Sequence, residues 1–273
     1  MSQRSFLFVP GNRPARFDKA CAAGADVVIV DLEDAVVGAE KAAARDAARA
    51  WLQTGGRAWL RLNGTETAWH ALDLPLLDLP GVLGVMLPKA ERREDLQALA
   101  ARAAGRPLVP LIETALGLWR AHELASVPGV TRLAFGSVDF QLDTGIVGEG
   151  DELLYARSQL VVVSRAAGLL APVDGVTVAL EDADVLAADV VRARRLGMGA
   201  KLCIHPQQVA VVNRGFLPRP DEIAWAREVV AAALAAQDNA VRLDGKLIDR
   251  PIIERARALL AAAPEAAAPE ATA

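Results

Sequence analysis

The chain has 273 residues, of which 53% are hydrophobic and 4% aromatic, and its formal net charge is −4. This length suits one large domain with an appendage or two smaller domains, and the acidic balance argues against a general nucleic-acid binder. No signal-peptide pattern and no apolar stretch of about 18 residues is found, so we expect no membrane segment. The two cysteines, Cys21 and Cys203, imply no disulfide framework, and we therefore expect a cytoplasmic protein.

Eight apolar, strand-like segments follow one another along the first 206 residues and alternate with helical patterns. This alternation predicts parallel pairing, and the count of eight favours an α/β fold closed as a (β/α)8 TIM barrel over an open doubly wound sheet. No Gly-x-Gly-x-x-Gly motif follows the first strand, which weakens a dinucleotide-binding interpretation. The first two predicted strands end near Val9 and Val30. The other six span residues 57–63, 81–89, 107–114, 131–136, 174–179 and 201–206. The predicted helices span 92–104, 115–124, 152–167 and 182–196.

The pattern changes after Phe216, where two prolines interrupt the chain. Helices are predicted at 221–236 and 250–262, with a polar, glycine-containing loop at 238–245 between them. We therefore expect a catalytic barrel at residues 1–216, a C-terminal helical extension or lid at 217–262, and a disordered, low-complexity tail at 263–273.

Nearly every residue that could perform chemistry follows the end of a predicted strand, and only the seventh strand brings no ionisable group. A parallel barrel gathers these ends at one rim. Glu113 and Asp139 are the sharpest pair: two rim carboxylates without clustered His or Cys suit a hard cation that keeps several waters, such as Mg²⁺. The alternative is that Glu113 caps the next helix and Asp139 the following turn.

Glu33 and Asp34 form a second acidic pair, which could bind metal-coordinated water or cap the next helix. Arg61 and Lys89 are cations at strand ends. An arginine fork matches a carboxylate or enolate oxygen, whereas an ion pair between Arg61 and Asp31 or Glu33 is the competing interpretation.

Three cations, Arg13, Arg16 and Lys19, gather where the first loop enters a helix. They could hold a phosphate or carboxylate, because helix N-termini favour anions. A solvated helix face is the alternative for them. His205 follows the last strand and precedes a proline, and we expect a structural role for it.

Seven short motifs in register resemble the citrate lyase beta subunit-like branch of the HpcH/HpaI aldolase superfamily, over roughly residues 4–260. Each motif alone is weakly specific, but seven in the same order are a strong indication. The motifs are FVPGN at 8–12, DLEDAV at 31–36, RLN at 61–63, LPK at 87–89, IET at 112–114, FGSVDF at 135–140 and IHPQQ at 204–208.

The resemblance implies a trimer-forming TIM barrel that uses Mg²⁺ to cleave or form C–C bonds of 3-hydroxyacyl-CoA thioesters such as citryl-, malyl- or citramalyl-CoA. It also implies roles for residues of this chain: Glu113 and Asp139 would bind Mg²⁺, Arg61 would hold the substrate carboxylate or nascent enolate, and Glu33 and Asp34 would orient metal-bound water.

A further motif, LDGKLIDRP at 243–251, also resembles that family. The likeness implies that Asp249 comes from a neighbouring subunit and acts as acid or base. The alternative is a helix N-cap, because Asp249 precedes Arg250-Pro251.

We therefore predict a Mg²⁺-dependent C–C lyase that acts on an acyl-CoA thioester, as a homotrimer or hexamer, with Arg13, Arg16 and Lys19 as substrate-binding cations. The alternatives are a free 2-keto acid aldolase, including a Schiff-base route through Lys89, a malyl-CoA thioesterase or malate synthase-like activity, and a non-catalytic subunit of a larger lyase complex. Ser137-Val138 departs from the resemblance, because many relatives carry Gly or a polar residue there, and it leaves the acyl group open.

Overall fold

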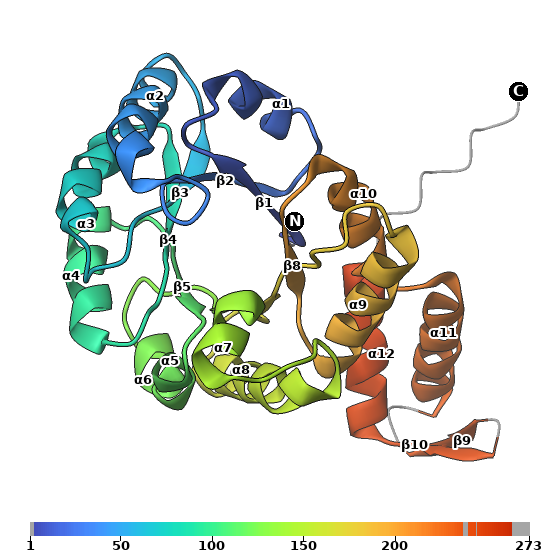
Figure 1. The fold of residues 1–273 in the computed structure, drawn as a ribbon. Helices are drawn as coiled ribbons and strands as arrows, with labels where there is room; N and C mark the ends of the chain where they lie inside the picture. Colours follow the sequence, from blue (N-terminus) through green and yellow to red (C-terminus); the bar gives the residue numbers. More distant parts are fainter. Residues whose placement is uncertain (1–2, 237–239, 244, 264–273) are drawn as a thin grey trace, which may run out of the picture. The chain divides into compact units, whose positions relative to one another are not determined.

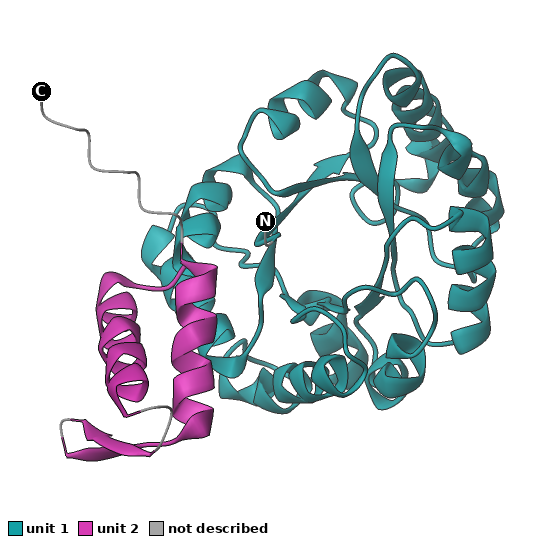
Figure 2. Cartoon of the chain, turned by 180° about the vertical axis from the view of Figure 1, so that it is seen from behind, with its two compact units in different colours: residues 1–216 teal, residues 217–273 magenta. Residues whose placement is uncertain are grey.

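The computed structural model describes residues 3–236, 240–243 and 245–263. The chain divides into two compact units, Met1–Phe216 and Leu217–Ala273 (Figure 2). Among the described residues, no helix is long and apolar enough to cross a membrane.

The first unit is a closed barrel of eight parallel strands in chain order, with β1 paired to both β2 and β8 (Figure 1). The prediction of a (β/α)8 TIM barrel is confirmed. The strands are β1 (Ser5–Pro10), β2 (Val27–Asp31), β3 (Ala58–Arg61), β4 (Val82–Leu87), β5 (Leu108–Ile112), β6 (Ala134–Phe135), β7 (Val173–Asp174) and β8 (Ala200–Cys203).

Helices surround the strands, as Figure 1 shows. The helix predicted at 115–124 is divided in two at Arg120, whose backbone leaves helical geometry with ψ 8°. The α-helices of this unit are α1 (Phe17–Cys21), α2 (Lys41–Gln53), α3 (Ala68–Asp73), α4 (Arg93–Ala103), α5 (Ala115–Trp119), α6 (Ala121–Ala125), α7 (Ser137–Thr144), α8 (Leu154–Ala166), α9 (Ala183–Leu196) and α10 (Pro206–Gly215); the 3-10 turns are η1 (Pro14–Arg16), η2 (Gly38–Glu40), η3 (Leu74–Asp78) and η4 (Asp151–Leu153).

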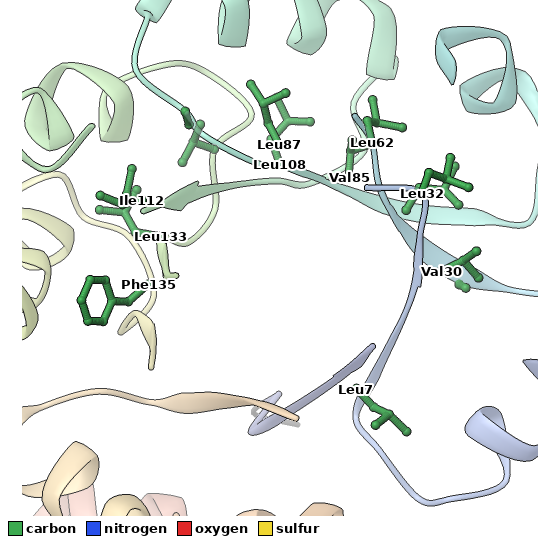
Figure 3. Close-up of a cluster of buried hydrophobic side chains, with 14 of the residues drawn as sticks. Leu7, Val30, Leu32, Leu62, Val85, Leu87, Leu108, Ile112, Leu133 and Phe135 are labelled. Carbon is green, nitrogen blue, oxygen red and sulfur yellow. The ribbon is translucent and has the colours of Figure 1, made fainter. Parts of the chain in front are cut away.

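Side chains alternate along the strands between the barrel lumen and the layer of helices, because successive residues of a strand face opposite sides. The larger apolar cluster includes Leu7, Val30 and Phe135, which point from the strands toward the helices in Figure 3. A separate cluster fills the lumen and includes Ile29, Trp59, Met86, Leu111 and Leu202. Ile29 and Trp59 face the lumen. Asp31 and Arg61 lie two residues further along the same strands, so they face the same side and reach the barrel mouth.

The second unit contains α11 (Pro220–Ala235) and α12 (Arg250–Ala262), which share a small core with Ile248. The predicted helices are present, but the predicted loop at 238–245 is partly wrong. Residues Val241–Leu243 form β9, which pairs antiparallel with β10, Lys246–Ile248. Gly245 supplies the left-handed turn between them, with φ 76°. Residues 264–273 of the predicted disordered tail lie outside the described residues.

Candidate active site

A cavity of about 230 Å³ opens at the C-terminal ends of the barrel strands. Active sites of TIM barrels occupy this end. Of the residues predicted to perform chemistry, Asp34, Arg61, Glu113 and Asp139 line the cavity, and Asp31 joins them.

Asp31 and Arg61 form a buried, two-pronged ion pair at this mouth. They are neighbours across the β2–β3 pairing. Nε of Arg61 donates to Oδ1 of Asp31 at 2.7 Å, and Nη2 donates to Oδ2 at 2.6 Å. Burial opposes the charge of Arg61, but the carboxylates of Asp31 and Glu33 overcome it and raise the pKa of Arg61. The ion pair considered from the sequence is therefore present, and one edge of the guanidinium is committed to Asp31.

The loop after β2 is held in place by Asp31 from one side and by Lys41 from the other. The carboxylate of Asp31 accepts from the backbone N–H of Glu33 at 2.9 Å and from that of Ala35 at 3.3 Å. Nζ of Lys41 donates to the carbonyls of Leu32 and Glu33, both at 2.7 Å. The next helical turn, η2, has Val37 at its N-cap, so Glu33 and Asp34 do not cap it.

Lys89 connects the two acidic pairs. Its Nζ lies 2.6 Å from Oε1 of Glu33 and 3.9 Å from Oδ1 of Asp139. Its backbone N–H donates to Oε1 of Glu113 at 2.7 Å, from a left-handed backbone with φ 46° that is unusual for a lysine. Burial opposes its charge, but the hydrogen bond to Glu33 and the nearby carboxylates raise the pKa of Lys89. A Schiff base requires a neutral amine, so this environment disfavours that route.

Glu113 is as deeply buried as Asp31, with 1% of its surface exposed. Burial raises the pKa of Glu113 to about 8; Arg61 opposes this effect, and the negative charges of Asp139 and Glu33 add to it. Thr114, not Glu113, caps the next helix, because Oγ1 of Thr114 accepts from the N–H of Gly117 at 3.0 Å. The capping alternative for Glu113 is therefore wrong.

Asp139 lies in the first turn of α7, with about a third of its side chain exposed. Gly136 precedes that helix and leaves room for the neighbouring carboxylate, since a Cβ at this position would collide with Oε2 of Glu113. The two carboxylates thus face one cavity from adjacent strand ends.

Glu33 and Lys89 pair with each other at the mouth but do not line the cavity, and five other residues considered from the sequence do not line it either. Arg13, Arg16 and Lys19 are exposed on the segment after β1, with Arg13 as the N-cap residue of η1, Arg16 at its end and Lys19 on α1. Asp249 is the N-cap residue of α12 in the second unit, but its side chain makes no capping hydrogen bond. His205 caps α10, where its Nδ1 accepts from the N–H of Gln207 at 3.3 Å. The side-chain N-cap considered for Asp249 is therefore not observed, whereas the structural role expected for His205 agrees with its contacts.

Sequence reasoning missed Lys41, which is 6% exposed although it begins a helix that reads as amphipathic. A lysine in a helical pattern normally indicates a solvated face, so its sequence context gives no signal for burial. Asp31 was considered only as an ion-pair partner. Its position in register with Arg61 is the signal that could have marked it as a central residue of the mouth.

A (β/α)8 barrel whose mouth gathers four carboxylates and Arg61 in one cavity defines an enzyme of the TIM-barrel class. Residues 4–206 match the HpcH/HpaI aldolase/citrate lyase family, and the chain belongs to that family. Membership of this family confirms the prediction of a carbon–carbon lyase.

Relatives with assigned names cover almost the whole chain. A citrate lyase subunit beta-like protein of Deinococcus radiodurans is 38% identical over 94% of this chain and 96% of its own length. A (3S)-malyl-CoA thioesterase of Cereibacter sphaeroides is 34% identical over 94% of this chain and 93% of its own.

A solved structure shares the fold at similar identity. The protein CitE from Mycobacterium tuberculosis, in complex with magnesium, acetoacetate and coenzyme A, superimposes with a TM-score of 0.84 at 33% identity. The match covers 96% of this chain and 98% of that one. The resemblance read from the seven sequence motifs is confirmed.

Proposed function

We propose that this protein is a Mg²⁺-dependent lyase that cleaves the C–C bond of a 3-hydroxyacyl-CoA thioester. The observation that carries the proposal is the meeting of Glu113 and Asp139 with Arg61 and Lys89 at the barrel mouth. Carboxylates suit a hard cation, and the two cations suit the negative charge that develops on the substrate. The relative that binds magnesium, acetoacetate and coenzyme A supports the same set of ligands here.

Glu113 and Asp139 would hold the metal. The buried carboxylate of Glu113 has its pKa raised to about 8, and a divalent cation would provide the positive charge that favours ionisation. In the described part of the chain no three His, Cys, Asp or Glu side chains are grouped to hold a metal. Waters and substrate oxygens would therefore complete the coordination, as Mg²⁺ prefers. Bound there, Mg²⁺ would act as a Lewis acid on the substrate hydroxyl and carboxylate.

Cleavage breaks the bond between the hydroxyl-bearing carbon and the carbon next to the thioester. The hydroxyl proton passes to a carboxylate, for which we propose Asp249 of a neighbouring copy in a homotrimer or hexamer. The electron pair of the broken bond stays on the acyl-CoA as an enolate, which then takes up a proton. Arg61 and Lys89 would stabilise that negative charge, and Glu33 and Asp34 would orient water bound to the metal.

Arg13, Arg16 and Lys19 are proposed to bind the phosphates of CoA. All three side chains are exposed, on the segment that follows β1. Replacing all three with serine should raise KM for a CoA thioester while kcat changes little, because the substitutions remove ground-state binding. An unchanged KM would place the CoA phosphates elsewhere.

The test of the proposed function is an assay of the purified protein with malyl-CoA and citramalyl-CoA, in which acetyl-CoA, the 2-oxo acid and free CoA are measured separately. EDTA should abolish cleavage, and Mg²⁺ or Mn²⁺ should restore it. Efficient cleavage of a free 4-hydroxy-2-keto acid, with no response to CoA thioesters, would instead identify a free-acid aldolase.

A thioesterase is the second candidate, because a relative at 34% identity carries the name (3S)-malyl-CoA thioesterase. Hydrolysis adds water across the thioester and releases free CoA with the intact hydroxy acid. Cleavage of the C–C bond instead releases acetyl-CoA with a 2-oxo acid. Free CoA as the first product would favour the thioesterase over the lyase.

A further inference from the structure

The barrel mouth is divided into a charged half and an apolar half. Four adjacent strands, β2 to β5, end in the ionic groups described above, from Asp31 to Glu113. The next strands around the closed barrel, β7, β8 and β1, contribute only apolar side chains to the lining of the cavity. These are Phe8, Pro10, Val176, Leu202 and Ile204.

The boundary lies after β6, where two consecutive residues of α7 belong to different halves. Asp139 stands on the charged side, within 3.9 Å of Lys89. Val138 precedes it, lines the same cavity and is 48% exposed. Ile204 at the end of β8 is 40% exposed, so the apolar wall is open to the cavity and not sealed inside the core.

The apolar wall does not arise from a lack of ionisable residues on these strands. Asp174 on β7 and Lys201 on β8 are both fully buried, on the side of the strands that faces the helices. There Asp174 accepts from Nε of Arg157 at 2.7 Å, and Nζ of Lys201 donates to the carbonyl of Gly175 at 2.7 Å. The charges of β7 and β8 are thus turned away from the cavity.

The hydroxyl, carboxylate and thioester oxygens of a 3-hydroxyacyl thioester all require the charged half. With these oxygens on the charged half, the remaining substituent of the hydroxyl-bearing carbon would face the apolar half. A hydrogen atom there would leave Val138 and Ile204 in contact with water, whereas an alkyl group would cover them and gain the free energy of apolar burial.

We propose that Val138, Val176 and Ile204 form an alkyl subsite, and that the preferred thioester carries an alkyl substituent on its hydroxyl-bearing carbon. This inference rests on the proposed lyase function and extends it to the class of acyl group. Val138 is the specificity-determining residue, because it stands beside Asp139 at the boundary of the two halves.

The test compares two thioesters that differ by one methyl group on that carbon, citramalyl-CoA and malyl-CoA. An apolar subsite discriminates one methylene by about 10- to 200-fold, so we expect kcat/KM to favour citramalyl-CoA by at least about tenfold. Equal kcat/KM values would overturn the inference. They would also be the result if the apolar wall contacts only the pantetheine arm, which both substrates share.

Val138→Thr keeps the β-branched shape and replaces a methyl group with a hydroxyl, so it should reduce the preference toward unity. Val178→Thr is the matched control. Val178 follows β7, is 51% exposed and does not line the cavity, so the preference should survive that change. A preference that is intact in Val138→Thr, or lost equally in both variants, would contradict the proposal.

Binding of free acids separates this inference from the proposed function. Citramalate and malate differ by the same methyl group, and their affinities for the Mg²⁺-loaded protein can be measured by calorimetry without catalysis. Tighter binding of citramalate in the wild type, lost in Val138→Thr alone, would support the alkyl subsite even if no thioester is cleaved. Failure of C–C cleavage would then overturn only the lyase, and equal affinities would overturn only the subsite.

Discussion

Asp31 is the residue that organises the charged half of the mouth. Its carboxylate accepts two hydrogen bonds from Arg61 and two more from backbone N–H groups of the following loop. It therefore fixes the guanidinium and the path of the chain that carries Glu33. Because the protein itself provides these partners, we assign Asp31 a positioning role. The substrate would contact the groups that Asp31 holds, such as Arg61.

The first prediction at the residue scale concerns this ion pair. Asp31→Asn keeps the shape of the side chain but removes the carboxylate that accepts two hydrogen bonds from the buried Arg61, which is left with Glu33, 3.1 Å from Nη1, as its countercharge. Breaking a buried pair in this way costs about 3–5 kcal/mol of the free energy of unfolding, which urea denaturation would measure.

Asp78→Asn is the matched control, because Asp78 also pairs with an arginine, Arg102, through two hydrogen bonds, but at an exposed site. Exposed pairs contribute little, so its unfolding midpoint should hardly move. If the two variants lost similar free energies of unfolding, burial would not explain the contribution of the Asp31–Arg61 pair to stability.

A second prediction concerns Glu113. Glu113→Gln retains the size and the hydrogen bond from Lys89 but removes the negative charge that a cation requires. Calorimetric titration with Mg²⁺ should show strongly weakened binding, while the fold, followed by circular dichroism, stays intact.

Glu94→Gln serves as the control for Glu113, because Glu94 is exposed in the first turn of α4 and does not line the cavity. Its Mg²⁺ titration should match the wild type. Undiminished Mg²⁺ binding by Glu113→Gln would remove Glu113 from the proposed metal site.

Among the elements of the barrel, the junction of β6 with α7 decides the positions of Glu113 and Asp139, the two carboxylates that we propose to bind Mg²⁺. A single residue, Gly136, separates the strand from the helix, and its N–H continues the barrel pairing by donating to the carbonyl of Ile112 at 2.9 Å. Its missing side chain is the space that Glu113 occupies. The close approach of the two strand ends therefore depends on a glycine at this position.

The corresponding prediction is that Gly136→Ala damages the site more than the fold. The added Cβ would press on the side chain of Glu113, and overpacking of this kind costs about 1–3 kcal/mol of the free energy of unfolding. Displacement of a group that holds a metal ligand typically lowers metal affinity by about 10- to 100-fold, which a Mg²⁺ titration would detect. Wild-type Mg²⁺ affinity in this variant would show that Glu113 can move without loss.

For the molecule as a whole, the proposed mechanism requires that the second unit of one copy completes the site of another. Asp249 stands at the start of α12 without capping it, so its carboxylate is not committed to the helix terminus. A proton acceptor from a neighbouring copy could exclude water from the mouth as it arrives.

Subunit complementation tests this arrangement. Asp249→Ala and Glu113→Ala should each be folded and nearly inactive. When the two variants are refolded together, mixed oligomers should regain activity, because some sites combine an intact Glu113 from one copy with an intact Asp249 from another. Absence of recovered activity, with subunit mixing demonstrated by mass spectrometry of the oligomers, would place Asp249 within its own site or outside catalysis.

The order of the strands and the residues that reach the rim could both be predicted from the amino-acid sequence. Both follow from local information: the apolar period marks each strand, and closure of a parallel barrel brings residues such as Arg61 and Glu113 to one end. The length of β7 was predicted wrongly. A strand was expected at 174–179, but β7 ends at Asp174. The residues that follow are as apolar as those of a strand, yet they do not pair with a neighbouring strand. Nor did the sequence predict the hairpin in the second unit, whose short strands lie within a polar segment.

The partners of the rim residues are fixed in the folded chain, and the sequence offered an ion pair of Arg61 with Asp31 or Glu33 only as one alternative. Arg61 meets Asp31 across 30 residues of sequence, and Lys89 meets Glu33 across 56. No local pattern encodes such partners, because they are set by the register of strands that the closed barrel places side by side. The same closure turns Asp174 and Lys201 toward the helices and leaves Val138 and Ile204 facing the cavity, so the division of the mouth into a charged and an apolar half exists only in the folded chain.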